Sequence, residues 1–527
     1  MRKNLRRSAL TISFFISTAH FGLVTTPFII RGDVTPDFSR ESISSVVFIL
    51  RLNPQNFSPN GTINPLMFKN LFPELNTNDS LLILEPLRLP LNAKQHPMLK
   101  GIVRLIISDT LQTSTIIRYL RNHPEVIWIE NEPQRKTAVI DKPNAIHFSE
   151  IPILETDAPP NDPLLPAQWY LFAISALAAW DYTKGDSSVI ISVVDIGIDL
   201  NHPDINGKIW SNWRELSGEE GIDDDDNGFV DDIYGWDFYD NDPDPRAENN
   251  DPHGTHVAGL AGAMTDNGYG IAGVGWKCQL MPLRAGTGTT ILRGYEAIIY
   301  AAEMGAKVIN LSWGGETPSN VERIAIEYAQ QKGAIVVSAA GNLFGTGTPF
   351  PYYPAGYQST IAVGALDSRD QRAFFSNYGY WVDVYAPGSD ILSLFPNAQF
   401  GHLSGTSMAT PLISGALALT WSRFPHWSPE QIKWQILTTG DSIVSSDTNG
   451  SMITVKKLNL ARALWAEPIS ALIDSFWFDD TLWGNSNSRI VRDEVIALII
   501  QATHYHSQPI DLTCEIIYSS PYLTITP

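Results

Sequence analysis

The hydrophobic residues of the chain are grouped in short continuous runs, which polar and glycine-rich segments separate. Three runs, 189–194, 279–283 and 334–340, are short and dominated by branched or long apolar residues. Continuous runs of this kind indicate strands that are buried on both faces of a parallel sheet. Two longer runs, 254–264 and 408–421, combine small and apolar residues and have the length of helices. Strands and helices that alternate in this way predict an α/β fold, a parallel sheet flanked by helices on both faces.

A second pattern precedes this region. Residues 101–107 and 125–130 are strand-like, and a polar helical piece at 110–122 lies between them. A proline-rich stretch at 151–163 predicts an extended linker, because proline disfavours helix at its own position and at the one before it. These elements predict a small α/β module before the central domain.

A third pattern follows the central domain. Residues 491–503 and 512–518 are strand-like and are separated by polar turns. We therefore divide the chain into an N-terminal module at 27–155, a central domain at 156–465 and the start of a β-rich domain at 466–527. The last segment is too short to close a β-sandwich, so we expect an incomplete domain there.

The first residues have the pattern of an export signal. Arg2, Lys3, Arg6 and Arg7 precede an apolar stretch at 9–16. A small-x-small cleavage site follows at 17–19, and together these features predict a signal peptide over residues 1–26. The protein is then expected outside the cell, either secreted or at the cell surface. Apolar patches continue to residue 30, so an uncleaved membrane anchor is the alternative. We expect no stable membrane span after signal cleavage.

The overall composition agrees with an exported globular protein. The chain has 527 residues, of which 44% are hydrophobic and 17% charged, so a large core can form. Its net charge of −20 disfavours a nucleic-acid partner, which would select a basic surface. The only cysteines are Cys278 and Cys514, which lie in different predicted domains and imply no disulfide framework. We expect a monomer.

Four polar residues stand where catalytic groups are placed in α/β folds. Asp195 ends the first strand run, and Asn342 follows the strand run at 334–340. His253 and Ser407 each open one of the two helical runs. A serine nucleophile, a histidine base, a carboxylate that orients the base and an amide that holds an oxyanion are the groups that acyl transfer needs. The set predicts nucleophilic catalysis at a carbonyl.

Each of these residues has a simpler interpretation when taken alone. Ser407 could be a helix N-cap, Asp195 a strand-end turn residue, and Asn342 part of a Gly-Asn turn. His253 could also be a capping residue, and His256 is a rival base in the same motif. We interpret His256 as a structural hydrogen-bonding residue on the buried face of the helix, about one turn further on. The local sequences of all four motifs favour the catalytic interpretation.

The motifs Val-Val-Asp-Ile-Gly, His-Gly-Thr-His-Val-Ala-Gly, Ala-Ala-Gly-Asn and Gly-Thr-Ser-Met-Ala-Thr-Pro resemble those of the subtilisin family of serine proteases, in the same order. The resemblance extends over residues 160–465. It implies that Asp195, His253 and Ser407 form the triad and that Asn342 completes the oxyanion hole. One departure is Ile196, where the family usually has threonine or serine.

The resemblance also implies partners and regulation. In the family a segment like 308–315 forms one wall of the cleft and pairs with the substrate backbone, so Ser312, Trp313 and Gly314 are expected to bind substrate. The module at 27–155 resembles a subtilisin propeptide, which assists folding and blocks the cleft. The expected partners are protein or peptide substrates and the chain's own propeptide. Self-cleavage is expected between Pro133 and Pro163. An unrelated N-terminal domain is the alternative.

The stretch between Asp195 and His253 carries a calcium-loop pattern. Asp223, Asp225 and Asn227 recur at alternate positions and Gly228 follows, as in the first half of an EF-hand loop. Asp231 or Asp232 could add a carboxylate, although the bidentate glutamate of that motif is absent. The alternative is a solvated acidic loop. A weaker second cluster comprises Asp240, Asp242 and Asp244.

A different structural calcium site is implied by the family resemblance alone. Asp204 and Asn267 fall on positions that hold an ion in the family, and Gln168 could complete the site. The alternative for all three is that they are turn or surface residues.

The sequence therefore predicts a secreted serine endopeptidase with structural calcium, made as a zymogen. It hydrolyses peptide bonds through an acyl-enzyme intermediate. A pseudoprotease that only binds peptides is disfavoured because all catalytic groups are present. An esterase of the α/β-hydrolase type would need a Gly-x-Ser-x-Gly elbow and the order Ser, Asp, His, whereas Ser407 comes last and lies in Gly-Thr-Ser-Met-Ala.

Overall fold

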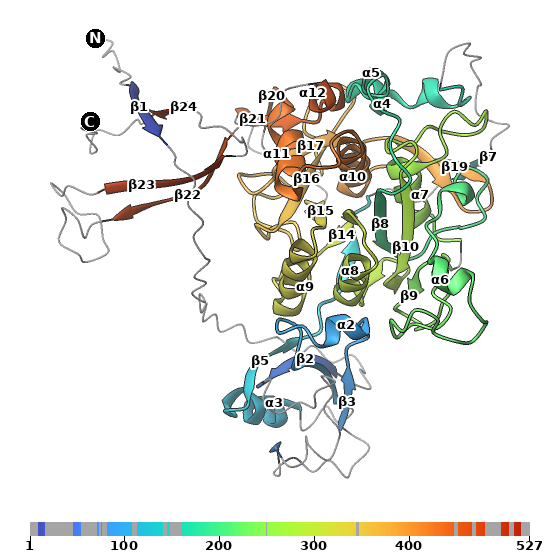
Figure 1. The fold of residues 1–527 in the computed structure, drawn as a ribbon, viewed down its shortest axis with the longest axis vertical. Helices are drawn as coiled ribbons and strands as arrows, with labels where there is room; N and C mark the ends of the chain where they lie inside the picture. The colour runs from blue at the N-terminus through green and yellow to red at the C-terminus, as the bar shows by residue number, and fades with distance from the viewer. Residues whose placement is uncertain are drawn as a thin grey trace. The chain divides into compact units, whose positions relative to one another are not determined.

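The computed structural model describes most of the chain between residues 82 and 465 and shorter segments outside this range. The described residues are 9–15, 46–53, 71–72, 75, 82–107, 113–140, 145–147, 160–248, 250–343, 347–446, 452–465, 471–479, 497–504 and 511–517. They form two compact units, one of Met1–Arg40 with Glu467–Pro527 and one of Glu41–Ala466 (Figure 1).

The larger unit is built on a nine-stranded sheet. Its strand order is β20 (Asp441–Ser446), β21 (Met452–Lys457), β17 (Val384–Pro387), β16 (Thr360–Leu366), β15 (Ile335–Ala339), β13 (Val308–Leu311), β8 (Ile190–Asp195), β10 (Gln279–Arg284) and β9 (Trp236–Asp237). Neighbouring strands are parallel except β20 and β21. The predicted parallel sheet is confirmed.

Helices cover both faces of this sheet. Helices α7 (His253–Gly262) and α10 (Thr406–Arg423) pack on one face, and α8 (Gly294–Glu303) and α9 (Asn320–Gln331) pack on the other (Figure 1). The two faces have separate cores, and alternate residues of β8 belong to each: Ile191 and Val193 face one core, whereas Val194 faces the other. This alternation explains why the strand is hydrophobic throughout. The shorter helices are α4 (Trp169–Ala173), α5 (Ala176–Ala179), α6 (Trp213–Leu216), α11 (Pro429–Thr439) and α12 (Leu460–Trp465).

The N-terminal part of this unit is an antiparallel sheet with one helix beside it. The strand order is β3 (Leu82–Pro86), β4 (Ile102–Ile107), β2 (Val46–Leu52) and β5 (Val126–Asn131), with α3 (Thr113–Asn122) and the short α2 (Leu91–Lys94). Buried Leu50, Leu105 and Leu120 contribute to a core of its own. The predicted strands at 101–107 and 125–130 and the helix between them are confirmed. From here on, the N-terminal module means the described residues between 46 and 132, the part of the expected module at 27–155 that contains this sheet.

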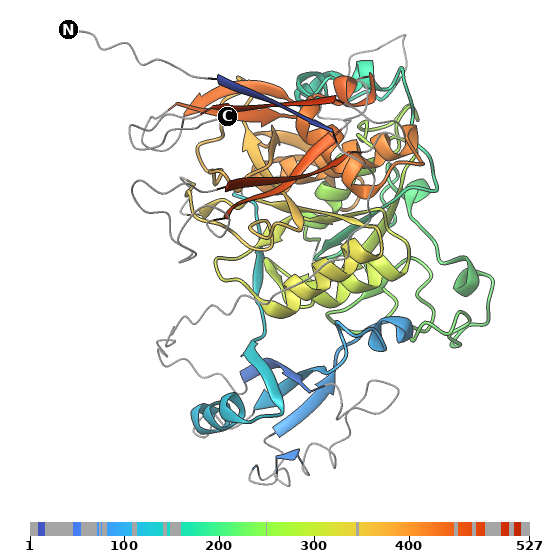
Figure 2. The same cartoon turned by 60° about the vertical axis from the view of Figure 1, so that its left-hand side comes forward.

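The chain leaves the N-terminal module in an extended conformation and runs along the rest of the unit, as the cyan segment of Figure 2 shows. Strand β6 (Arg135–Thr137) lies between β12 (Thr290–Ile291) and β14 (Trp313–Gly314), antiparallel to both, in a sheet that β11 (Gly286–Thr287) completes. Further on, β7 (Ala145–His147) pairs with β19 (Gln399–Leu403), which pairs in turn with β18 (Ile391–Phe395).

The described residues of the smaller unit form two antiparallel strand pairs. Strand β1 (Ala9–Phe15) pairs with β24 (Asp511–Ile517), and β22 (Ala471–Asp479) pairs with β23 (Ala497–His504). The expected strands near 491–503 and 512–518 correspond to β23 and β24. The other residues of the predicted signal peptide lie outside the described part, and the signal peptide stays a prediction.

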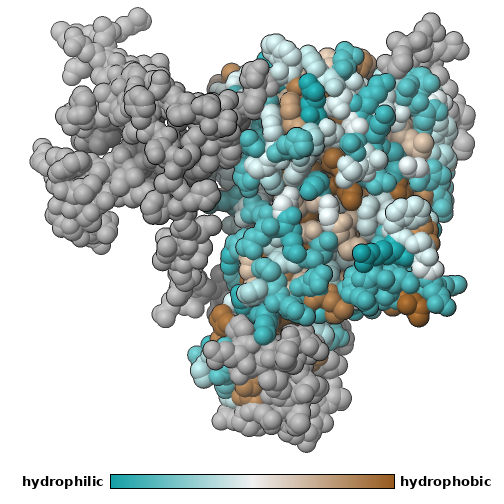
Figure 3. Space-filling view, viewed as in Figure 1, coloured by the Kyte–Doolittle hydropathy of each residue, from teal (hydrophilic) through white to brown (hydrophobic). Residues whose placement is uncertain are grey.

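The exposed surface of the larger unit is predominantly polar. The face seen in Figure 3 is mostly hydrophilic, and hydrophobic residues are scattered over it in small groups. Within the described residues, we find no helix with the length and apolar character needed to cross a membrane. Cys278 is buried and unbridged.

Candidate active site

The carboxyl end of β8 brings Asp195 next to the first residue of α7. Asp195 Oδ1 accepts hydrogen bonds from His253 Nδ1 at 2.8 Å and from the Ile196 amide at 2.9 Å. Both side chains are nearly inaccessible, with exposures of 0% and 4%. A buried carboxylate is costly without a partner, and the imidazole supplies one. The carboxylate in turn fixes the orientation of the ring and places the proton on Nδ1.

Two polar atoms of this pair are left free. Asp195 Oδ2 and His253 Nε2 are buried and have no hydrogen-bond partner within the described residues. Ile196, at the position where the family usually has a hydroxyl residue, contributes only its backbone N–H. An unpartnered buried Nε2 is costly, and this nitrogen is the one that a catalytic base must offer to its nucleophile.

Ser407 is the second residue of α10, which follows Gly405. Its hydroxyl donates to the carbonyl of Ser312 at 2.7 Å and not to His253. Helices α7 and α10, which begin with His253 and near Ser407, pack on each other, and the Ser407 hydroxyl is hydrogen-bonded to Ser312 O instead of the His253 imidazole. Rotation about χ1 can reorient a serine hydroxyl, and catalytic hydrogen bonds often form only in the reacting complex.

Asn342 is oriented by a residue that the sequence analysis did not single out. Its Oδ1 accepts from both the amide and the hydroxyl of Thr406 at 3.0 Å, and the Thr406 hydroxyl also accepts from the Gly341 amide. These hydrogen bonds fix the orientation of the Asn342 amide. They leave Asn342 Nδ2 buried without a partner among the described atoms. A free N–H donor of this kind is what an oxyanion hole requires.

An extended segment of the chain lies against the residues that were predicted to bind substrate. The Ala138 amide donates to Ser312 O at 3.0 Å, and the Ser407 amide donates to Ala138 O at 3.0 Å. Two residues earlier, Lys136 pairs with Gly314, and Thr137 pairs with Trp313. The predicted substrate-binding residues thus flank an extended peptide.

The arrangement singles out one peptide bond. The Ser407 amide hydrogen-bonds to the carbonyl of the peptide bond between Ala138 and Val139. On the far side of that bond, the Ile140 amide donates to Ser404 O at 2.8 Å. Gly405 makes the approach possible, because a Cβ there would come within 2.3 Å of Ala138 O.

His256, the rival base, has a different environment. Its Nε2 lies 2.9 Å from the Ile391 carbonyl, and the ring is fully buried. Burial lowers the pKa of His256 to about 3, so the ring is neutral at physiological pH. This agrees with the structural role expected from the sequence.

In the acidic loop, residues 223–232, several side chains form hydrogen bonds within the loop itself. Asp223 accepts from the amides of Asn227 and Gly228, and Asn227 donates to Asp232 at 2.8 Å. Asp225 and Asp232 come together with Glu215, and one oxygen from each lies within 4.8 Å of the others. Burial raises the pKa of Asp232 to about 6, which a bound cation would oppose. Glu215, from α6, was missed because it lies outside the loop pattern.

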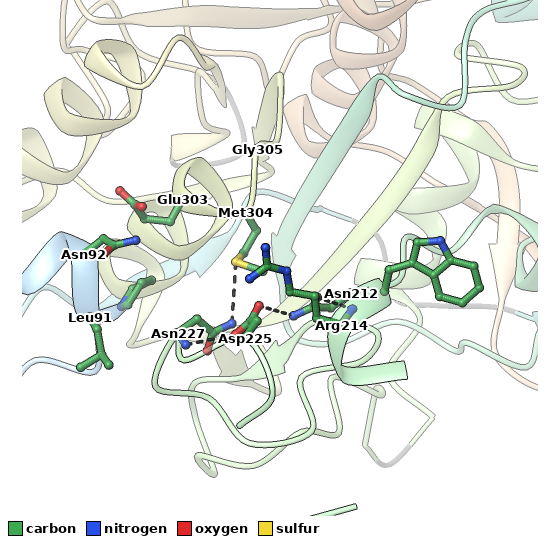
Figure 4. A pocket seen from close by; sticks show the side chains of 11 residues that line it. Leu91, Asn92, Asn212, Arg214, Asp225, Asn227, Glu303, Met304 and Gly305 are labelled. Atoms are coloured by element: carbon green, nitrogen blue, oxygen red, sulfur yellow. Dashed lines mark hydrogen bonds between the residues drawn. The ribbon is translucent and has the colours of Figure 1, made fainter. Parts of the chain in front are cut away.

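Oxygen ligands of this kind suit calcium. A cavity of about 380 Å³ adjoins the acidic loop, lined by Asp225 and Asn227 on one side and by Leu91 of α2 on another. Figure 4 shows Asn212 donating to Asp225 at the wall of this cavity, a bond of 2.9 Å. The Leu91 amide donates to Asn227 O at 2.9 Å, so the N-terminal module touches the acidic loop.

The weaker acidic cluster is used in other contacts. Asp240 and Asp237 both form ion pairs with the buried Arg284, and Asp244 pairs with Arg246. Asp242 Oδ1 accepts from the Asp244 amide at 2.9 Å. These contacts fit turn residues and ion pairs rather than a cation site.

The residues of the second expected calcium site are close in space. Asn267 Nδ2 donates to Asp204 Oδ1 at 2.8 Å. Gln168 instead bonds its amide oxygen to the Ala272 N–H at 2.8 Å and donates to the Ala272 carbonyl. The additional carboxylate nearby is Asp162, which accepts from the Asn267 amide. Burial raises the pKa of Asp204 to about 8 and that of Asp162 to about 6. The assignment of Gln168 as a ligand stays a prediction.

Comparison with known proteins identifies the family of the chain. The model of the Subtilase family matches residues 186–458, more than half of the chain. The chain therefore belongs to the subtilase family, a class of serine endopeptidases.

Individual relatives cover the same region. Over 274 residues the chain is 43% identical to a thermophilic serine proteinase of Bacillus sp. (strain AK1), a match that covers 51% of this chain and 61% of that protein. Over 296 residues it is 40% identical to thermitase of Thermoactinomyces vulgaris, covering 55% of this chain and 94% of thermitase. Among solved structures, one of the proteases from Pseudoalteromonas arctica PAMC 21717 is similar, with a TM-score of 0.49, 28% identity and coverage of 59% of this chain and 99% of that one.

Proposed function

We propose that this chain is a secreted, calcium-supported serine endopeptidase made as a zymogen, and that it cuts itself between Ala138 and Val139. The single observation that carries the proposal is the Ala138 carbonyl, held at 3.0 Å by the Ser407 amide at the start of α10, the helix that packs on α7 and its His253. This is the position that the scissile carbonyl of a substrate needs.

The residues then act in sequence. The Ser407 hydroxyl turns to His253 Nε2, loses its proton to that nitrogen and attacks the Ala138 carbonyl carbon. The Ser407 amide and Asn342 Nδ2 hold the oxyanion of the tetrahedral intermediate. Protonated His253, stabilised by Asp195, gives its proton to the amide nitrogen of Val139 as the bond breaks. Water then hydrolyses the acyl-enzyme by the same steps.

The N-terminal module is held by two carboxylates, which supports its role as a propeptide. Glu130 accepts from the amides of Asn320 and Val321 at 2.9 and 3.0 Å, at the start of α9. Glu132 accepts from Arg293 at 2.7 Å and from the Tyr295 hydroxyl at 2.5 Å, at the start of α8. A carboxylate at a helix N-terminus is favoured by the free amides and by the helix dipole.

Calcium would have a structural role. Glu215, Asp225 and Asp232 would hold the ion at the acidic loop, and Asp204 with Asn267 would hold another. The ion supplies positive charge that removes repulsion between carboxylates. Both groups lie apart from the catalytic residues, so calcium supports the fold and takes no part in the chemistry.

Mapping the first cut tests the proposal. Full-length protein is sampled at early times, and the new N-termini are determined by sequencing and mass spectrometry. We expect Val139 as the first new N-terminus, and we expect Ser407→Ala protein to stay intact with its N-terminal module attached. Ala138→Pro should slow the cut, because proline lacks the N–H that donates to Ser312 O. A first cut elsewhere, or one that persists in Ser407→Ala, contradicts the assignment.

A fluorophosphonate probe separates the enzyme from a pseudoprotease. The probe should label Ser407 in the processed protein, and it should leave Ser407→Ala unlabelled. Peptide and ester substrates compared on the same protein separate a peptidase from an esterase.

A further inference from the structure

Arg135 is the fourth residue before the Ala138–Val139 bond, and its side chain is buried against the central domain. Its Nε and Nη2 donate to the two oxygens of Glu322, each at 2.8 Å. The two side chains are only 3% and 2% exposed. Two parallel hydrogen bonds between a guanidinium and a carboxylate form the strongest and most directional kind of ion pair.

The surroundings of Arg135 are shaped for a long cationic side chain. Glu322 lies in the first turn of α9, where its backbone amide is bound by Ser319 Oγ. Gly315 leaves the room that the guanidinium fills, because a Cβ at this position would approach Arg135 Nη1 to 2.7 Å. A branched side chain at position 315 would close the pocket. Lys136, the next residue of β6, is exposed and has no comparable side-chain contact among the described residues.

Glu322 belongs to the central domain, so it stays there when the cut at Ala138–Val139 releases the residues up to Ala138. It then loses the guanidinium that pairs with it, and a carboxylate left in a partly closed pocket without a cation is costly. A substrate with arginine in the fourth position restores both hydrogen bonds. Lysine would restore the charge but not the paired geometry.

We propose that Glu322 forms a binding subsite for the guanidinium of arginine at the fourth position before the cut, and that this subsite selects peptide substrates in general. The proposal rests on the proposed endopeptidase function, since it needs a substrate that lies in the cleft as residues 135–138 do. It makes Glu322 a specificity-determining residue and not a catalytic one.

The test uses enzyme produced from the full chain after its own processing. A quenched fluorescent peptide with the sequence of residues 131–142 is compared with versions that carry leucine, lysine or glutamate in place of the arginine. We expect kcat/KM for the arginine peptide to exceed that for the leucine peptide about 10- to 100-fold, as hydrogen bonds to charged groups allow. The lysine peptide should lie between them, and the glutamate peptide should be cleaved most slowly.

Variants of the enzyme assign the preference to one carboxylate. Glu322→Gln should reduce the preference for arginine over leucine to about 3-fold or less, because an amide removes the charge and keeps the shape. Glu322→Arg should favour the glutamate peptide. Glu327→Gln removes a half-buried carboxylate on the same helix that pairs with Arg323, and it should leave the preference unchanged.

The outcomes distinguish the two proposals. Equal cleavage of all four peptides by the wild-type enzyme overturns the subsite and leaves the endopeptidase function standing. Failure to cleave any of them overturns the endopeptidase function. If Glu322→Arg does not process itself, the double variant Glu322→Arg with Arg135→Glu should restore processing, and a double variant that stays unprocessed counts against the pairing.

Discussion

The proposed catalytic cleft, with Asp195, His253, Asn342 and Ser407, and the acidic loop both contain buried polar groups, but the hydrogen bonding of these groups differs. In the cleft, Asp195 Oδ2, His253 Nε2 and Asn342 Nδ2 are buried without a partner within the described part of the chain. In the acidic loop and the adjoining α6, each oxygen of four carboxylates accepts at least one hydrogen bond. These carboxylates are Glu215, Asp223, Asp225 and Asp232.

We attribute the difference to how long a ligand is bound at each of the two sites. The cleft must bind groups that exist only during the reaction, so its donors and acceptors are held in place by neighbours and left free themselves. The acidic loop would hold a resident ion, so its carboxylates are already positioned by backbone amides, and each oxygen keeps a lone pair for a ligand. Free atoms at the first site and satisfied atoms at the second make different predictions for substitution.

The largest effect is expected in the triad. Ser407→Ala and His253→Ala should each slow the cut at Ala138–Val139 by roughly a million-fold, which is the loss known for the homologous triad of subtilisin, and the double variant should lose little more. The rate is measured as first-order conversion of the full-length chain. Nearly additive losses in the double variant would mean that the two residues do not act as a unit.

A smaller loss is expected at the free amide. Asn342→Ala removes one oxyanion donor and should lower the same rate about 100- to 1000-fold, again the magnitude known for subtilisin itself. The melting temperature should also fall somewhat, because alanine removes the Oδ1 that accepts from the amide and hydroxyl of Thr406, so the rates are compared at a temperature where both proteins are folded. A large fall in melting temperature with a normal rate would show that this donor is structural.

Calcium and substitutions in the acidic loop should change the stability of the protein and not the rate of the cut. Calcium at about 100 times its Kd should stabilise the Ser407→Ala protein by about 2.7 kcal/mol per site, seen as a higher melting temperature than with chelator. Asp225→Ala should remove part of this gain. Asp244→Ala, an exposed carboxylate paired with Arg246, serves as the control. Equal melting temperatures with calcium and with chelator would leave the acidic loop as a solvated surface.

The smallest effect is expected at His256, the second histidine of α7, and concerns the stability of the protein at acid pH. Burial holds the folded-state pKa of His256 at about 3, below its ordinary value of 6.5, so the unfolded chain binds the extra proton between these values. His256 should therefore add stability at neutral pH that is lost as pH falls from 6.5 to about 3, by at most about 1.4 kcal/mol per pH unit. Melting of Ser407→Ala protein across this range should show a shallower acid loss with His256→Gln. An unchanged slope would mean that other groups govern acid stability.

The positions of the site residues that local motifs define were predicted from the sequence alone, and their catalytic roles belong to the proposed function. Strand-end positions gave Asp195 and Asn342, and helix starts gave His253 and Ser407, because a continuous hydrophobic run predicts where a strand ends and therefore which residue follows at the sheet edge. Strands β4 and β5 and helix α3 of the N-terminal module were predicted from the same kind of pattern, whereas β2 and β3 were not.

Residues that act across long separations were not predicted. Thr406 orients Asn342 from 64 positions away, and Glu322 meets Arg135 across 187 positions. Glu215 joins the acidic loop from α6. The local pattern of hydrophobic and polar residues cannot predict such contacts, because they form only when distant segments come together in the folded sheet. Gln168 remains an expected ligand, and its hydrogen bonds with Ala272 were not predicted either.

The position of β6 has a kinetic consequence. A peptide strand tethered within the same chain meets the nucleophile at a high effective concentration, so the first cut is unimolecular. Its half-life should be the same at nanomolar and micromolar protein, and trace wild-type enzyme should not shorten it for protein whose own cleft is still filled. Digestion of other proteins is bimolecular and should begin only when that strand has left. Dilution thus distinguishes the molecule acting on itself from the molecule acting on others.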